Sequence, residues 1–367
     1  MKITKVEVYK FSIKSRMGIF KWSSGAAAGT DNILVKIRTD EGIVGIAEAP
    51  SRPTIYGETQ DSLFAAVNKF LGPAILGMDP FDLEKIMDKL DTTLVWNPCA
   101  KGAIDIAIHD IIGKASNLPA YKLLGGWNEG KKVPVSWMLG LGSPEEIACQ
   151  AVEWVQKGFK ALKLKAGMDP KKEIEMFRAV RKAVGKDILL YVDANQGWSP
   201  HTAIQTIQEM EKEGLAWIEE PVPAWDRKGR ELVAKSISVP ILGDESVFTP
   251  QDVQREIEMG VIRMISIKTP RTGFYKSKKI IQMAEEANIP CLVGSQGETG
   301  IGTAASAHFA CAFKNIKLPS EISLLLFYEG DLLKEEVRIE GGFVKVPQGT
   351  GIGVEIDEEK LKKYSVP

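Results

Sequence analysis

The chain has 367 residues, of which 44% are hydrophobic and 26% are charged. A chain of this length can bury a large core, and we expect one large domain together with a smaller one. The formal net charge of −1 gives no reason to expect nucleic acid or an anionic membrane as a partner. The first residues lack a signal-peptide pattern, and no apolar run reaches the roughly 18 residues of a membrane span. The composition therefore predicts a cytoplasmic protein.

The four cysteines agree with a reducing compartment. Cys99, Cys149, Cys291 and Cys311 lie far apart, and no two of them have the spacing of a zinc or redox motif. Scattered cysteines in a cytosolic protein are usually reduced thiols inside the core. We therefore predict four free, buried cysteines.

The N-terminal part has the pattern of an antiparallel sheet followed by helices. Residues 2–14 and 32–39 alternate between apolar and polar side chains, and a third run at 43–48 follows a turn. Three such strands in succession predict a meander. Apolar residues then recur at helical spacing in three segments, which are residues 59–71, 80–91 and 99–116. In the last segment, we expect His109 to be a packing or surface histidine rather than a ligand.

The connection between the first two strands, residues 15–31, is rich in small residues but carries Phe20 and Trp22 near its centre. One interpretation is a disordered surface loop. The other is a lid, in which small residues give mobility and an aromatic side chain closes over a substrate and excludes water. Tyr56, in the connector before the first helix, also has two interpretations: an exposed tyrosine, or a side chain that reaches the same site.

From Val133 onward, strand patterns alternate with helical patterns. We expect the first strand at residues 133–140, with the sequence VPVSWMLG. Five further strand patterns each end in charge, at intervals of 24 to 28 residues, namely at Lys165, Asp193, Glu219, Asp244 and Lys268. One strand–helix unit of a parallel barrel has about that length. The five charges should therefore stand side by side around one mouth, at the carboxyl ends of successive strands.

The signs of these charges indicate a metal-assisted proton transfer. Three carboxylates from separate strands form an oxygen-only set of ligands, which suits Mg²⁺ better than Zn²⁺ and leaves positions open for a substrate. Lysines on both sides of that set can add or remove a proton on either face of a bound molecule. Because a nearby cation lowers the pKa of a lysine, we expect Lys165 and Lys268 to be usable bases near neutral pH. Lys163 shares a strand face with Lys165.

The alternation of side chains along a strand leaves some choices open. Asn195 lies on the same strand face as the acid two residues before it, and it can donate to a ligand carboxylate or support the metal. Glu219 and Glu220 point to opposite faces, so that only one of them can be a ligand. Asp244 and Glu245 present the same choice.

A glycine-rich turn after the seventh strand pattern has a rival interpretation. Gly300, Gly302 and Ala305 have the spacing of a dinucleotide-binding turn, and Glu321 follows at a distance that suits a ribose contact. That fingerprint normally opens a doubly wound sheet, whereas this turn comes near the end of a long alternation. We therefore expect no NAD site, and we interpret the turn as backbone N–H groups that help to hold a substrate oxygen.

Together these motifs resemble the enolase superfamily, and within it the muconate-lactonizing subgroup of the mandelate racemase/muconate lactonizing enzyme family. The similarity covers nearly the whole chain. Residues 103–126, AIDIAIHDIIGKASNLPAYKLLGG, are similar to the family's link between capping domain and barrel, and residues 298–308, ETGIGTAASAH, to its seventh-strand turn and helix. The matching polar residues are Lys163, Lys165, Asp193, Asn195, Glu219, Asp244, Glu245 and Lys268.

The resemblance implies a fold and a division into domains. The fold would be a modified TIM barrel, (β/α)7β, with an N-terminal α+β capping domain that the C-terminal segment completes. The capping domain would span residues 1–125 with its lid at 15–31, the barrel residues 126–328, and the returning segment residues 329–367. We expect the eighth barrel strand at residues 316–322. Homo-oligomers with an even number of subunits are common in the resembled family.

The resemblance also implies roles for the charged residues. The metal would be Mg²⁺, or Mn²⁺ in its place, with the ligands Asp193, Glu219 and Asp244. Lys165 or Lys268 would move the proton α to a substrate carboxylate, and the metal and Lys163 would stabilise the enediolate that forms. A further set would surround the substrate or the metal, namely Asn195, Glu245, Glu298, Glu321, Tyr56, Phe20 and Trp22.

The substrate would be a small molecule with a carboxylate, and two reactions fit the lysine pair equally well. One is that of a muconate-type cycloisomerase, which Glu321 and the ETGIGTAASAH segment favour. The other is that of a dipeptide epimerase or N-acylamino acid racemase, although the Asp-x-Asp motif of dipeptide epimerases is replaced here by Glu321-Ile322-Ser323. A dehydratase or o-succinylbenzoate synthase is less favoured, and an NAD-dependent oxidoreductase least.

Overall fold

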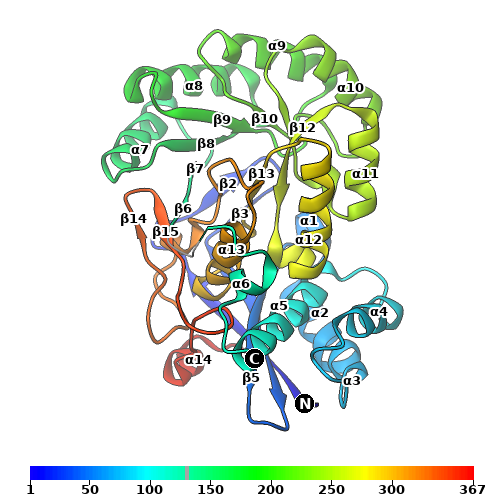
Figure 1. Ribbon diagram of the computed structural model, residues 1–367. Helices are drawn as coiled ribbons and strands as arrows, with labels where there is room; N and C mark the ends of the chain where they lie inside the picture. Colours follow the sequence, from blue (N-terminus) through cyan, green and yellow to red (C-terminus); the bar gives the residue numbers. More distant parts are fainter. Residues whose placement is uncertain (129–131) are drawn as a thin grey trace.

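The structure, a computed structural model, describes residues 1–128 and 132–367 and has two parts (Figure 1). One part is an antiparallel sheet with helices beside it, built from the N-terminal third of the chain. The other is a ring of parallel strands with helices on its outer side, coloured green to orange. The predicted fold class, a TIM-type α/β barrel with an α+β capping domain, is confirmed.

The N-terminal sheet is the predicted meander. Its strands pair antiparallel in the order β1-β4-β5, with Lys10 opposite Ile33 and Leu34 opposite Glu48. The connection after β1 is ordered, because it forms a two-stranded hairpin of β2 and β3. The five strands are β1 Ile3–Lys14, β2 Phe20–Trp22, β3 Gly25–Ala27, β4 Gly29–Thr39 and β5 Val44–Pro50.

Helices follow the sheet, and the longest of them packs against the barrel. They are α1 Pro53–Tyr56, α2 Gln60–Ala65, the π-helix η1 Ala66–Leu71, α3 Gly72–Ala74, α4 Leu83–Thr93, α5 Pro98–Ala115 and α6 Ala120–Leu124. Thr59 caps α2 where the sequence predicted a helix start, because its side chain accepts a hydrogen bond from the Ser62 N–H. Gly102 lets α5 approach the barrel closely, since a Cβ there would lie 2.6 Å from the Pro270 carbonyl oxygen.

Seven parallel strands form the ring, and they follow one another from β7 to β13 as in the sequence. The strands are β7 Trp137–Leu139, β8 Ala161–Lys165, β9 Leu189–Asp193, β10 Ile218–Glu219, β11 Ile241–Gly243, β12 Ile262–Ile267 and β13 Cys291–Val293. The helices after them are α7 Pro144–Gln156, α8 Pro170–Val184, α9 Pro200–Glu211, α10 Arg227–Ser236, the short 3₁₀ turn η2 Glu245–Val247, α11 Pro250–Met259, α12 Thr269–Glu286 and α13 Gly300–Ala312. Parallel pairing aligns Lys165 with Asp193, and Asp193 with Glu219. The predicted charges therefore lie next to one another.

The eighth strand is present only as isolated bridges. Residues 316–322, where the sequence predicted it, form no continuous ladder. Bridges nevertheless join this segment to β13 at Cys291 on one side, and to Val135, just before β7, on the other. The Glu321 N–H donates to the Val293 carbonyl oxygen at 2.7 Å. The segment thus closes the ring and holds Glu321 at its mouth, and it leads into the 3₁₀ turn η3, Leu324–Phe327.

The first predicted barrel strand is divided between two sheets. Only β7 joins the parallel ring, whereas β6, Lys132–Pro134, pairs antiparallel with β15, Phe343–Lys345, which pairs in turn with β14, Ile339–Glu340. Pro134 has no N–H with which to join a second neighbour, and this suits the edge position that β6 occupies. The prediction of one continuous strand over residues 133–140 was therefore wrong.

The C-terminal helix returns to the N-terminal sheet. α14, Glu358–Tyr364, precedes a hydrogen bond from the Val366 N–H to the Lys10 carbonyl oxygen of β1, at 3.1 Å. Glu358 also forms an ion pair of 2.6 Å with the buried Lys36 of β4. These contacts join the two ends of the chain, as a capping domain completed by the C-terminal segment requires. The domain boundaries themselves stay a prediction.

Smaller expectations had mixed outcomes. His109 is a packing histidine as predicted, since its ring contacts Phe274 and its Nδ1 lies 3.0 Å from the Asp105 carbonyl oxygen. All four cysteines are free, but only three are buried, because Cys149 lies on the outer face of α7.

Within the two described ranges, no helix has the length and apolar character needed to cross a membrane. The cytoplasmic location and the even number of subunits stay predictions.

A buried histidine on α13 should control stability in acid. His308 is fully buried, its ring stacks on Tyr121, and its Nδ1 accepts a hydrogen bond from the Tyr121 N–H at 3.3 Å. Burial lowers the pKa of His308 from 6.5 to about 4. Between these two values the unfolded chain binds more protons than the folded chain, so that stability falls as the pH drops through this window.

We predict that His308→Gln flattens this pH dependence, because glutamine takes up no proton. Between pH 7 and pH 4.5, the free energy of unfolding in urea should fall by about 2 kcal/mol more for the wild type than for the variant. The exposed His201 gives the matched control, His201→Gln, which should keep the wild-type slope. Equal slopes for the wild type and His308→Gln would contradict the assignment.

Candidate active site

The predicted acids and amines meet at the carboxyl ends of β8 to β12. They are Lys163, Lys165, Asp193, Glu219, Asp244 and Lys268. All are buried, and even the most exposed of them, Lys165, shows only 7% of its surface. A buried charge is costly unless another charge or a hydrogen bond compensates it. The site is therefore stable only if its acids and amines contact each other.

Lys163 of β8 stands at the centre of these contacts. Its Nζ lies 2.7 Å from Glu219 Oε2 and 3.0 Å from Asp193 Oδ2. It also lies 2.9 Å from both carboxylate oxygens of Glu321, which accepts a further hydrogen bond from the Tyr191 hydroxyl at 3.0 Å. One ammonium thus compensates three carboxylates from β9, β10 and the segment that closes the ring.

Lys165 and Asn195 lie beside this cluster. Lys165 Nζ lies 2.6 Å from Asp193 Oδ2 and 2.8 Å from Asn195 Oδ1. Asn195 adopts a left-handed backbone with φ of 42°, a conformation that asparagine tolerates better than most residues. Its Nδ2 donates to Glu245 Oε1 at 3.2 Å. Asn195 therefore orients the Lys165 amine, as well as lining the cavity.

The opposite side of the site contains a residue that the sequence analysis missed. Lys268 contacts Asp244 Oδ2, and Arg271 Nη1 donates to Asp244 Oδ1 at 3.0 Å. The Arg271 guanidinium is buried and lies over the ring of Phe248, 4.6 Å from its centroid. The available signal was the spacing Lys268-x-x-Arg271, which puts both cations at the start of α12. Arg271 thus holds the carboxylate that Lys268 also contacts.

Two of the buried lysines, Lys163 and Lys268, have raised pKa values. Burial by itself would lower the pKa of Lys268, but the carboxylates of Asp244, Glu245 and Glu219 together outweigh burial and raise the pKa above its ordinary value. The pKa of Lys163 is raised in the same way by Asp193 and Glu219. The lowered pKa that we expect for a lysine beside a bound cation stays a prediction, since these raised pKa values describe amines that face carboxylates.

The acids fall into two classes. Burial would raise the pKa of Asp193, but Lys163 and Lys165 together lower it below its ordinary value. Burial raises the pKa of Glu219, and the nearby charges of Asp193 and Glu321 raise it further. Neighbouring acids on adjacent strands thus have opposite preferences for a proton, which is frequent in functional sites.

The three predicted metal ligands turn towards amines in this arrangement. Within the part of the chain that the structure describes, no three His, Cys, Asp or Glu side chains are placed ready to hold a metal ion. The donors nevertheless fit a hard cation, because they are all oxygens and come from neighbouring strands. Glu219 Oε1 is also buried and has no hydrogen-bond partner among the described residues. A divalent cation would satisfy this oxygen.

Glu219 and Glu220 turn in different directions. Glu220 turns away from Lys163, and its Oε1 accepts hydrogen bonds from the N–H groups of Asp244 and Ser246 at 2.7 and 2.8 Å. Glu219 is therefore the acid that faces the ring interior, and Glu220 holds the turn after β11.

Two predicted substrate-binding residues lie behind the cavity wall. The ring of Tyr56 packs against Phe248, with 5.1 Å between centroids, and its hydroxyl is buried. Glu298 accepts hydrogen bonds from the Ser295 hydroxyl and, at 2.6 Å, from the Gln296 N–H. Neither side chain lines the cavity. Both therefore lie where they can support the cavity wall, and their role around the substrate stays a prediction.

The β2–β3 hairpin covers the cavity. The ring of Phe20 meets Phe327 edge-on, with 5.3 Å between centroids, and Trp22 lines the same cavity. The Ser23 hydroxyl donates to the Ala194 carbonyl oxygen at 3.1 Å, directly before Asn195 on the barrel. The interpretation as a disordered loop was therefore wrong, and the position of the hairpin is that of a lid.

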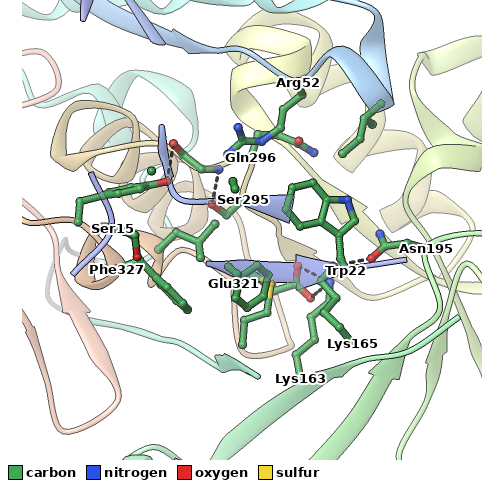
Figure 2. Close-up of a pocket in the computed structure, with 18 of the residues that line it drawn as sticks. Ser15, Trp22, Arg52, Lys163, Lys165, Asn195, Ser295, Gln296, Glu321 and Phe327 are labelled. Atoms are coloured by element: carbon green, nitrogen blue, oxygen red, sulfur yellow. Dashed lines mark hydrogen bonds and ion pairs between the residues drawn. The ribbon is translucent and has the colours of Figure 1, made fainter. Parts of the chain in front are cut away.

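The cavity under the hairpin has two polar ends and an apolar wall (Figure 2). One end contains the amines of the barrel with Asn195 and Glu321. The other contains Arg52, Ser295 and Gln296. The wall between them is formed by Phe20, Trp22, Ile55, Met138, Leu324 and Phe327. Such a cavity suits a small molecule that is polar at both ends.

Two known families match the chain. Residues 5–125 match the family described as Mandelate racemase / muconate lactonizing enzyme, N-terminal domain, and residues 146–360 match Enolase C-terminal domain-like. The chain therefore belongs to the mandelate racemase/muconate lactonizing enzyme family of the enolase superfamily.

Characterised relatives are isomerases. The L-Ala-D/L-Glu epimerase of Clostridium acetobutylicum is 38% identical over 296 residues, which are 80% of this chain and 82% of that protein. The N-succinyl-L-Arg/Lys racemase of Bacillus cereus is 33% identical over 368 residues, covering 100% of this chain and 98% of that protein. The chain is thus an enzyme of the isomerase group in this superfamily.

Solved structures share the whole fold. The muconate lactonizing enzyme of Mycobacterium smegmatis, complexed with muconolactone, has a TM-score of 0.96 and 35% identity, and the match covers 100% of both chains. The dipeptide epimerase of Enterococcus faecalis, complexed with Mg and L-Leu-L-Tyr, has a TM-score of 0.93 and 35% identity over 97% of this chain and 100% of that one.

We predict that Phe20→Ala loosens the hairpin. An aromatic pair contributes about 1 kcal/mol, so that its loss should raise the open population, and with it the rate of trypsin cleavage after Lys21, about fivefold. Native-state proteolysis followed by mass spectrometry measures this rate. The neighbouring Ile19 is 62% exposed, and Ile19→Ala is the matched control with an unchanged rate. Equal rates for both variants would show that Phe20 does not hold the hairpin down.

Proposed function

We propose that this enzyme moves the proton α to the carboxylate of a small organic acid. The observation that carries the proposal is the position of two amines, Lys165 on β8 and Lys268 after β12, which line one cavity from either side of the three acidic strands. A molecule held between them presents one face of its α carbon to each amine. One amine can then take the proton from one face while the other delivers a proton to the opposite face.

The difficult part of this reaction is the negative charge that develops on the carboxylate when the α proton leaves. The buried Lys163 ammonium is fixed by its carboxylate contacts, and it would face that charge without having to reorganise. Mg²⁺, or Mn²⁺ in its place, would be held by Asp193, Glu219 and Asp244 and would supply the larger part of the charge stabilisation. Lys268 has to exchange its contact with Asp244 for one with the substrate before it can act as a base.

Racemisation or epimerisation of an N-substituted amino acid is the first candidate for the overall reaction. It uses both amines, and it is supported by the names of the relatives from C. acetobutylicum and B. cereus. Cycloisomerisation of a muconate-type acid is the second candidate, which the similarity to the muconate lactonizing enzyme over the full chain supports. The two candidates share the α-proton step and differ in what happens to the rest of the substrate.

The proposal predicts that α-proton exchange in D₂O, followed by NMR, depends on both amines. With an N-acyl amino acid as substrate, Lys165→Met and Lys268→Met should each lower racemisation at least about 100-fold. Each variant should keep exchange for one enantiomer only, and the two variants should differ in which one. Lys186, which is exposed, gives the control Lys186→Met with wild-type rates. With muconate as the substrate, the same NMR assay detects a lactone product if the enzyme is a cycloisomerase.

The same NMR assay of α-proton exchange in D₂O measures the metal dependence. EDTA should abolish exchange, and added Mg²⁺ should restore it. Turnover that persists in chelator, or racemisation that survives in both lysine variants, would contradict the proposed function.

A further inference from the structure

We propose that Arg52 and Gln296 form an anion-binding subsite at the far end of the cavity, so that the substrate is a dianion with no free ammonium. This inference rests on the proposed function for the first carboxylate, which lies at the amine end. The second anionic group would lie across the apolar wall, where Figure 2 shows Arg52 and Gln296 on the side of the cavity away from Lys163 and Lys165.

Arg52 differs from the other cations of the cavity. Lys163, Lys165 and Lys268 each contact a carboxylate. The guanidinium of Arg52 donates only to the carbonyl oxygen of Ser51, at 2.7 Å, and no carboxylate of the described residues forms an ion pair with it. A half-buried guanidinium therefore has N–H groups directed at the cavity with nothing to compensate its charge. Its rigid fork of donors matches a carboxylate.

Gly297 holds this guanidinium in place. A Cβ at this position would lie 1.4 Å from Arg52 Nη2, so that the absence of a side chain leaves the space that Arg52 occupies. The Gly297 carbonyl oxygen accepts hydrogen bonds from the hydroxyls of Thr30 and Tyr328, at 2.9 and 3.0 Å. These bonds fix the turn against the capping sheet. The guanidinium thus packs against a backbone turn that is hydrogen-bonded to the capping sheet.

Gln296 supplies a second donor that has no partner. Its side chain is only 3% exposed and lines the cavity, and its Nε2 makes no hydrogen bond within the described residues. A buried donor without a partner is costly, and a ligand oxygen would remove that cost. Arg52 and Gln296 together offer N–H groups and a positive charge, which selects for an anionic oxygen rather than for a cation.

The acids of the cavity exclude a substrate with a free ammonium. Glu321 is the only acid among the described residues that line it. Both of its oxygens already contact Lys163, and Tyr191 donates to one of them. No carboxylate remains to compensate an ammonium, so the amino group of an amino-acid substrate must be acylated. The chemical class is thus an amino acid acylated by a dicarboxylic acid, or an unsaturated dicarboxylic acid.

Matched pairs of compounds test the subsite. N-succinyl-L-leucine and N-butanoyl-L-leucine differ only in the distal carboxylate, and so do cis,cis-muconate and its monomethyl ester. For the wild type, kcat/KM and the calorimetric Kd should favour the dianion of at least one pair at least about 30-fold. Arg52→Gln should remove most of this preference, weakening the dianion about 10- to 100-fold, mainly in KM, and the monoanion less than threefold.

Controls separate the subsite from general electrostatics and from folding. The Arg52 side chain makes no capping bond to α1, so that Arg52→Gln leaves the helix start intact. Lys14 is exposed at the end of β1, and Lys14→Gln removes a nearby positive charge outside the cavity without changing the preference. Gln296→Met should weaken the dianion selectively, as Arg52→Gln does.

The outcomes distinguish the subsite from the proposed function. A wild type that binds both members of each pair equally, or an Arg52→Gln variant that keeps the preference, would overturn the subsite even if α-proton exchange is observed. A preference for the dianion in calorimetry that depends on Arg52, together with no α-proton exchange, would support the subsite and contradict the proposed function. L-Leu-L-Tyr is a dipeptide with a free ammonium. If the wild type binds it as tightly as the dianions, or more tightly, the inference is also overturned.

Discussion

Mutual compensation of buried charge is the constraint on which this structure depends. Asp193, Glu219 and Asp244 are almost fully inaccessible at the ends of three adjacent strands. Carboxylates in such a position would be too costly without cations beside them. The neighbouring strands β8 and β12 supply those cations as lysines. The parallel pairing of these strands brings their charged ends next to one another.

The same compensation prepares the site for chemistry. Lys163 serves three carboxylates at once, which leaves the acids with unequal preferences for a proton. Asp193 stays ionised because two amines lower its pKa, whereas burial and like charges raise the pKa of Glu219.

Much of this arrangement was predictable from the sequence because it follows from periodicity. The regular spacing from Lys165 to Lys268 predicted parallel strands with their charges at one mouth, and strand alternation predicted that Lys163 and Lys165 share a face. The division of the first predicted barrel strand was not predictable from alternation, because β6 and β7 have similar patterns and only tertiary pairing separates them.

The side chains that were missed or misplaced depend on loop geometry. Tyr56 ends the four-residue helix α1, and Glu298 lies on a connector. In such short segments a turn of the backbone decides between cavity and core, and no periodicity reports that turn. Arg52 and Gln296 come from loops far apart in sequence that meet only in the folded protein. The raised pKa of Lys268 depends on which group occupies the space beside Asp244, and composition carries no information on this.

Three strand-end acids, Asp193, Glu219 and Asp244, would form one cation site within a cluster whose other charges compensate each other. A crystal structure of the protein with Mn²⁺, using anomalous scattering to locate the ion, tests it most directly. The account predicts a single strong peak in bonding contact with oxygens of Asp193, Glu219 and Asp244, with Lys163 Nζ moved away from Glu219. A peak elsewhere, or no peak at saturating Mn²⁺ with the lysines still paired to these acids, would contradict the account.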